Sequence, residues 1–149
     1  MKIYFAHPAF TPEQINFKEE FLQKLQDCFE ANRIARGIPT PEMLDPFSYT
    51  GNLGNKNLDR AISFMDCRLL GTCSLILAVT DHDDTGVAFE LGFAYAHGIP
   101  AILISKDQSA HEANAMLTGA ANAIIGDILE TKNIQTLTEV IHGFIGSSK

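Results

Sequence analysis

The chain lacks the common motifs by which α/β proteins hold phosphate groups or activate a serine. Neither GxGxxG nor GxxxxGKS/T occurs in its 149 residues, so the sequence gives no support to dinucleotide binding or to a P-loop. The GxSxG turn of the α/β-hydrolases is also absent. The candidate catalytic groups that remain are carboxylates.

Cysteine is scarce and tryptophan is absent. The three cysteines are odd in number and show no CxxC spacing; they are Cys28, Cys67 and Cys73. This usage argues against a disulfide framework and a zinc site, and it is typical of proteins in a reducing compartment. We therefore expect a cytoplasmic protein.

Long apolar runs and clusters of basic residues are also missing. The apolar run at 3–6 is too short for the core of a signal peptide. The longest apolar region, 86–104, is interrupted by Glu90, His97 and Pro100, so no membrane span is expected. With 18 acidic and 11 basic residues the formal net charge is −7, which predicts that neither nucleic acids nor anionic membranes are partners.

Apolar segments of strand length alternate with amphipathic segments of helix length along the chain. Strands are predicted at 3–6, 75–79, 100–104 and 123–125, with a weak one at 34–38, and helices at 11–32, 58–69, 86–98, 111–117 and 137–144. Residues 37–56, rich in proline and glycine, are predicted to form a long loop. The pattern predicts an α/β fold: a single domain, residues 1–149, on a doubly wound, Rossmann- or flavodoxin-like parallel sheet of about five strands with helices on both faces.

The most informative segment is 84–92, Asp-Thr-Gly-Val-Ala-Phe-Glu-Leu-Gly, which follows the predicted strand 75–79. An acid at the carboxyl end of a strand, followed by a helix that carries another acid, is typical of the site in an open α/β sheet. Glu90 is predicted to lie within the first turn or so of this helix, where the helix dipole favours its ionised form. An ionised carboxylate at that place is a candidate nucleophile.

Asp84, Asp66 and Tyr4 are candidate partners of Glu90. Asp84 follows the same strand, Asp66 lies beside apolar residues near the end of a helix, and Tyr4 lies on the first strand. Carboxylates in unlike environments can divide the cleavage of a glycosidic bond, one attacking the anomeric carbon and the other protonating the leaving group. From spacing alone, each residue also has an ordinary interpretation. Glu90 could be a first-turn helix acid, Asp84 an N-cap, Asp66 a solvated acid and Tyr4 a core tyrosine.

A metal site is the weaker interpretation of the run Asp81-His82-Asp83-Asp84. The run contains oxygen and nitrogen ligands, but a polar loop with one histidine is usually only a loop. We therefore expect neither a metal nor another cofactor.

Together these segments resemble the nucleoside 2-deoxyribosyltransferase family. The resemblance runs from Tyr4 to about Gly119 and depends on four ordered pieces: Ile-Tyr-Phe-Ala at 3–6 with Phe10, Asp66 ahead of a strand, D-x-G-x-x-x-E-L-G at 84–92, and Asn-Ala-Met at 114–116. It implies transfer of a 2-deoxyribosyl group between nucleobases in nucleoside salvage, with retention over two displacements.

The resemblance also implies a role for each residue. Glu90 is the nucleophile that forms a covalent deoxyribosyl ester, Asp66 protonates the leaving base, and Tyr4 orients the nucleophile. The expected substrate-binding residues are Asp84, Asn114, Phe10, Met116, Gly86 and His7. Asn114 and Met116 would reach the site of a neighbouring subunit, which makes a homo-oligomer part of the mechanism. The expected partners are 2′-deoxyribonucleosides and free nucleobases.

Two alternatives stay open. The related 2′-deoxynucleoside 5′-monophosphate N-glycosidases share the tyrosine, the aspartate and the glutamate but transfer the sugar to water. Residues 115–121 resemble the corresponding segment of those enzymes. Those hydrolases carry small hydroxyl residues in place of Asp84 and Asn114. Because Asp84 would repel a phosphate dianion, free nucleosides are the expected substrates. The second alternative is a nucleoside- or nucleotide-sensing module without turnover, for which a paired nucleophile and acid would have no use.

Overall fold

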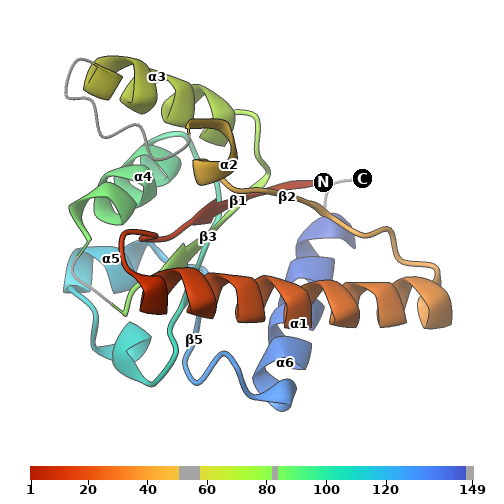
Figure 1. The fold of residues 1–149 in the computed structure, drawn as a ribbon. Helices are drawn as coiled ribbons and strands as arrows, with labels where there is room; N and C mark the ends of the chain where they lie inside the picture. The colour runs from red at the N-terminus through yellow and green to blue at the C-terminus, as the bar shows by residue number, and fades with distance from the viewer. Residues whose placement is uncertain (51–57, 82–83, 147–149) are drawn as a thin grey trace.

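Five parallel strands form the centre of the fold (Figure 1). The computed structural model describes residues 1–50, 58–81 and 84–146. Within them the strands β1 (Lys2–Ala6), β2 (Glu42–Leu44), β3 (Leu75–Val79), β4 (Ala101–Ile104) and β5 (Ala123–Ile125) lie side by side in the order β2-β1-β3-β4-β5. Every neighbouring pair is parallel. The predicted doubly wound α/β fold is therefore confirmed.

Helices cover both faces of this sheet (Figure 1). The helices α1 (Pro12–Arg36) and α6 (Thr131–Gly146) pack on one face, and α3 (Asp59–Leu70) and α4 (Thr85–Ala96) pack on the other, with the short α5 (Ala115–Ala120) beside α4. Successive residues of a strand point to opposite faces, so Ile3 and Phe5 belong to the core under α1 while Tyr4 belongs to the core under α4. Within the described helices, none combines the length and apolarity that crossing a bilayer requires.

The strand order places a crevice at the carboxyl ends of β1 and β3. The chain leaves β1 toward β2 on one side and enters β3 on the other. In open α/β sheets such a reversal of strand order leaves room for a ligand between the two outgoing connections. The segments that follow Ala6 and Val79 therefore frame the site.

The predicted strand at 34–38 is wrong. Instead, α1 continues to Arg36 and is capped by Gly37, whose φ of 66° lies in the left-handed region that glycine adopts without steric cost. Ile34 is 74% exposed on this helix, so it occupies no buried strand position. The edge strand beside β1 is instead β2, which lies inside the region predicted to be a loop.

Two other differences concern short helices. The short helix α2 (Phe47–Thr50) also falls within the predicted loop, of which residues 51–57 lie outside the described part. The helix predicted at 111–117 is divided into a 3₁₀ turn at Ser109–Glu112 and α5. The division occurs because the Asn114 side chain caps α5, accepting a 2.9 Å hydrogen bond from the Met116 amide.

Candidate active site

A hydrogen bond between Tyr4 and Glu90 joins β1 to α4. The Tyr4 hydroxyl donates to Glu90 Oε1 at 2.5 Å, and the Tyr4 side chain is fully buried. Burial and then the charge of Glu90 raise the pKa of the Tyr4 phenol well above its usual value. Tyr4 therefore stays protonated and acts as a hydrogen-bond donor to the carboxylate.

Glu90 lies further along its helix than the sequence predicts. It is the sixth residue of α4, beyond the first turn where the helix dipole acts. Burial raises the pKa of Glu90 to about 7; the Tyr4 hydrogen bond opposes this shift, and the charges of Asp66 and Asp84 add to it. Burial therefore opposes the ionised form that the helix dipole was expected to favour.

Asp66 approaches the pair from α3. Its carboxyl group is half-buried, and burial raises its pKa. The neighbouring Cys67 also lies near both carboxyl groups, since burial, then Asp66 and Glu90, raise the pKa of its thiol. Cys67 is not among the residues for which the sequence predicts a role in the site.

Asp84 begins α4 and faces the same site. Its Oδ1 accepts a 2.8 Å hydrogen bond from the Val87 amide and so caps the helix. A Cβ atom on Gly86 would lie 3.0 Å from this oxygen, so the glycine leaves room for the carboxylate to fold over the helix start. Asp84 is therefore the N-cap of α4 and also lies near Glu90. The charge of Asp84 raises the pKa of Glu90.

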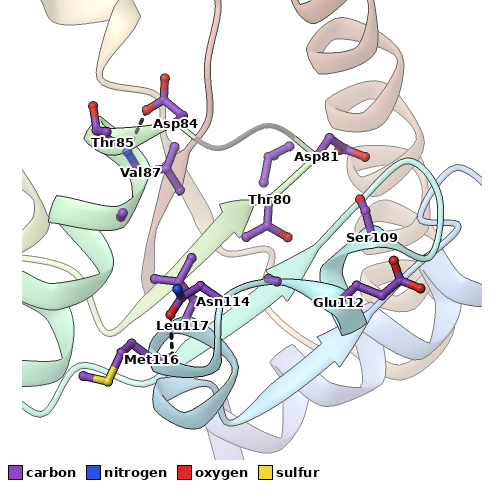
Figure 2. Close-up of a pocket in the computed structure, with 13 residues that line it drawn as sticks. Thr80, Asp81, Asp84, Thr85, Val87, Ser109, Glu112, Asn114, Met116 and Leu117 are labelled. Atoms are coloured by element: carbon purple, nitrogen blue, oxygen red, sulfur yellow. Dashed lines mark hydrogen bonds between the residues drawn. The ribbon is translucent and has the colours of Figure 1, made fainter.

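A cavity of about 640 Å³ lies between the start of α4 and residues 109–117 (Figure 2). Asp84 lines it on one side, and Asn114 and Met116 line it on the other, with Asp81 and Glu112 also at its wall. Among the described residues that form this wall, none is lysine or arginine. The structure therefore brings Asp84, Asn114 and Met116 together at a cavity of acidic character.

Phe10 and His7 lie on the opposite side of the crevice, in the segment that follows β1. Phe10 is 67% exposed, and its ring meets Phe47 edge-on at 5.8 Å between centroids. The His7 side chain is only 1% exposed and its Nε2 lies 3.1 Å from Asp45 Oδ1. Sequence analysis missed Asp45 and Phe47, and the signal that could have found them is their position directly after β2, the strand that was misplaced.

The carboxyl groups of Glu90 and Asp66 suit the cleavage of a bond between carbon and a heteroatom. Ionised Glu90 can act as a nucleophile, and protonated Asp66 can donate a proton to a leaving group. Across the parts of the chain that the structure describes, no three potential His, Cys, Asp or Glu ligands gather in a metal-binding arrangement. His82 and Asp83 of the run considered as a metal site lie outside those parts.

Solved structures of other proteins share this fold. A 2-deoxyribosyltransferase from Bacillus psychrosaccharolyticus is 24% identical with a TM-score of 0.70, over 91% of this chain and 90% of that chain. A conserved protein from Enterococcus faecalis is 19% identical with a TM-score of 0.60, over 100% and 99%. A CMP N-glycosidase from Clostridium botulinum is 16% identical with a TM-score of 0.59, over 95% and 99%.

The sequence itself identifies the family. No match to a curated protein was found, but residues 3–136 match the family model described as nucleoside 2-deoxyribosyltransferase. This match spans most of the chain and includes Tyr4, Asp66, Asp84, Glu90 and Asn114. The chain therefore belongs to the nucleoside 2-deoxyribosyltransferase family, as the ordered motifs of the sequence predict.

Proposed function

We propose that the protein transfers 2-deoxyribosyl groups between nucleobases in nucleoside salvage, through a covalent ester on Glu90. The observation that supports this most directly is the 2.5 Å hydrogen bond from Tyr4 to Glu90 Oε1. It fixes a half-buried carboxylate whose pKa of about 7 leaves both protonation states accessible near neutral pH.

In the first half-reaction, an oxygen of ionised Glu90 attacks C1′ of a 2′-deoxyribonucleoside. The C1′–N bond breaks, and its electron pair goes to the base nitrogen, which receives a proton from Asp66. Burial raises the pKa of Asp66 and so favours the protonated acid that this step needs. The products are the free base and a deoxyribosyl ester of Glu90.

In the second half-reaction, a nitrogen of another nucleobase attacks C1′ of the ester. The bond to Glu90 breaks, the carboxylate is restored, and the proton of the incoming base returns to Asp66. Two displacements at one carbon give net retention. Water in place of the second base would instead release deoxyribose.

The charge of the cavity favours neutral nucleosides and free bases over nucleotides. Three acidic residues line it: Asp81, Asp84 and Glu112. Their carboxylates would repel the phosphate of a nucleotide, since two like unit charges about 4 Å apart repel by roughly 4 kcal/mol at an effective dielectric constant near 20. We assign the sugar hydroxyl groups to Asp84 and Asn114 and a wall of the base site to Phe10. Gly86 contributes by leaving space beside Asp84.

Asn114 and Met116 line a cavity beside Asp84 of their own chain; we further propose a homo-oligomer in which the same two residues of a neighbouring copy complete the site built around Glu90. Met116 is 80% exposed, and the exposed rings of Phe89 and Tyr95 lie on α4, next to α5. Helices that carry large apolar side chains on an exposed face are usually covered by another surface.

The test is chromatography of purified protein with deoxyinosine, with and without adenine. Deoxyadenosine formed only with adenine, and lost in Glu90→Ala, is the expected result. Equal release of hypoxanthine and deoxyribose in both reactions would contradict transfer and indicate that the protein is a hydrolase. Binding of deoxyinosine without any released base would contradict both activities and indicate a sensing module.

A further inference from the structure

A second cavity lies on the face of the sheet opposite the Tyr4–Glu90 pair. It has a volume of about 390 Å³ and is formed between the first two turns of α1 and the segments that follow β3 and β4. Phe17 and Val79, which belong to the core under α1, give it apolar surface. Its charged lining consists of Glu13, Asp81, Lys106 and Asp107. The two half-reactions proposed above leave this cavity unused.

Backbone amides hold two carboxylates of this cavity in place. Both oxygens of Asp81 accept hydrogen bonds from the Lys106 amide, at 2.7 and 3.0 Å. Asp107 Oδ1 accepts a 2.7 Å hydrogen bond from the Ser109 amide. Hydrogen bonds from Ser109 also hold the pKa of Asp107 below its usual value, so this group is charged at neutral pH. Because both carboxylates have fixed positions, a ligand that binds them has little ordering to impose.

The third carboxylate, that of Glu13, has a partner that another cation can replace. Glu13 Oε1 lies 3.2 Å from Lys106 Nζ, and the two side chains are 78% and 53% exposed. Ion pairs as exposed as this one contribute little to stability, so a ligand cation can take the place of Lys106 beside Glu13. With three acidic residues and one basic residue, the lining has an excess of negative charge, which disfavours an anionic ligand.

The arrangement of these carboxylates suits an extended cation better than a metal ion. In the described parts of the chain, no three His, Cys, Asp or Glu side chains are placed to hold a metal, so the acids of this cavity do not surround one point. The apolar surface of Phe17 and Val79 suits a carbon chain, since sites for organic ligands combine an apolar lining with a few polar groups. A cation that carries its charge on a carbon chain satisfies both features.

We propose that this cavity binds an aliphatic amine, whose carbon chain packs on Phe17 and Val79 and whose ammonium groups donate hydrogen bonds to Asp81 and Glu13. Asp81 and Val79 also line the larger cavity, so the two cavities meet at the end of β3. Figure 2 shows the Asp81 side chain directed away from Asn114, and its bonds to the Lys106 amide place the carboxylate at the second cavity. The proposal does not depend on the proposed function.

The test is calorimetric titration of the full chain with putrescine, a diamine on a chain of four carbons, at constant ionic strength. We expect saturable binding at one site per chain. Butanediol, which has the same carbon chain without charge, is the ligand control and should not bind. Many weak sites per chain would show only the general attraction of a cation to a protein of net charge −7 and would overturn the proposal, as would the absence of any binding heat at millimolar putrescine.

Four variants locate the bound amine. Asp81→Asn and Glu13→Gln should each weaken putrescine binding roughly tenfold, because each removes a hydrogen bond to a charged acceptor. Lys106→Gln should instead tighten binding, because it removes the cation that competes for Glu13; damage to the fold would not produce such a gain. Glu112→Gln makes the same charge change in the wall of the larger cavity alone. It is the matched control and should leave the affinity unchanged.

Circular dichroism verifies that each variant is folded, and Asp81→Asn keeps an oxygen for the Lys106 amide. Unchanged affinity in both Asp81→Asn and Glu13→Gln would overturn the proposal. Equal weakening in Glu112→Gln and Glu13→Gln would place the amine outside the second cavity and would also overturn it. Neither result bears on base exchange, which the assay with deoxyinosine and adenine decides separately.

Discussion

Tyr4 and Glu90 are 86 residues apart in sequence, and the Tyr4 hydroxyl donates a 2.5 Å hydrogen bond to Glu90 Oε1. The bond crosses from β1 to the second turn of α4 and so links the two elements that frame the crevice. It holds one carboxylate oxygen, and Oε2 of the same group is the atom that we expect to attack C1′. We therefore expect the relative placement of β1 and α4 to set the direction of attack.

The first prediction concerns the pH dependence of base release. The proposed step needs Glu90 ionised and Asp66 protonated, so kcat/KM for deoxyinosine should follow a bell-shaped pH profile, and one limb of it should have its midpoint near 7, the pKa of Glu90. The measurement is a pH–rate profile at constant ionic strength. A profile with no limb near pH 7 would contradict the assignment.

The second prediction is that two neighbours of Glu90 shift its titration in opposite directions. The Tyr4 hydrogen bond lowers the pKa of Glu90 and the charge of Asp66 raises it. Tyr4→Phe should therefore move the titration to higher pH, and Asp66→Asn should move it to lower pH. Carbon-13 NMR of labelled glutamate, with the Glu90 signal assigned by its loss in Glu90→Gln, measures both shifts independently of turnover. Shifts of the same sign would contradict this account.

The order of helices and strands was predictable because apolar periodicity reports burial directly. The predicted runs at 75–79 and 100–104 correspond to β3 (Leu75–Val79) and β4 (Ala101–Ile104), which are buried on both faces, and such runs are recognisable without any partner. The edge strand β2 was not predictable in this way. It has three residues, of which only Leu44 is fully buried, and its pairing with β1 depends on the rest of the sheet.

The site was predictable where one segment carries its own chemistry, as at 84–92. The raised pKa of Glu90 was not, because it depends on burial in the folded chain and on Asp66 of α3, which is distant in sequence. The same holds for Asp45, whose partners His7 and Lys18 come from two other elements. Sequence patterns identify residue types and local spacing, whereas desolvation and charge pairing arise only from tertiary packing.

The third prediction links the same carboxyl group to stability. Between pH 4.5 and 7 the folded protein binds more protons at Glu90 than the unfolded chain does, because its folded pKa is raised. The stability of the protein relative to Glu90→Gln should therefore fall as pH rises through this window and stay low above it, by on the order of 2–3 kcal/mol. Urea unfolding of both proteins at pH 5 and pH 8 measures the difference. An equal difference at both pH values would contradict a buried, pKa-shifted Glu90.

The fourth prediction separates the two roles of Asp84. Asp84→Ser removes the charge and keeps a side-chain oxygen for the Val87 amide, whereas Asp84→Ala also removes the cap, at a cost of about 1 kcal/mol. Asp84→Ser should therefore improve the kcat/KM ratio of deoxyinosine 5′-monophosphate to deoxyinosine at least roughly tenfold, since repulsion of the phosphate is reduced. Steady-state kinetics with both substrates measures this ratio. An unchanged ratio in Asp84→Ser would show that Asp84 does not select against phosphate.

The last prediction tests whether the sites are shared between subunits. Glu90→Ala and Asn114→Asp should each be inactive for base exchange; aspartate keeps the oxygen that caps α5 but replaces the amide donor. If Asn114 serves the neighbouring site, a mixed oligomer combines Glu90 of one subunit with Asn114 of the other. Co-expression or refolding of the mixture should then recover activity that neither variant has alone. Glu90→Ala mixed with Asp66→Asn is the matched control: both residues serve the site of their own subunit, so every mixed site lacks one of them and no activity should return. A mixture of Glu90→Ala with Asn114→Asp that stays as inactive as this control would show that each chain builds its site alone.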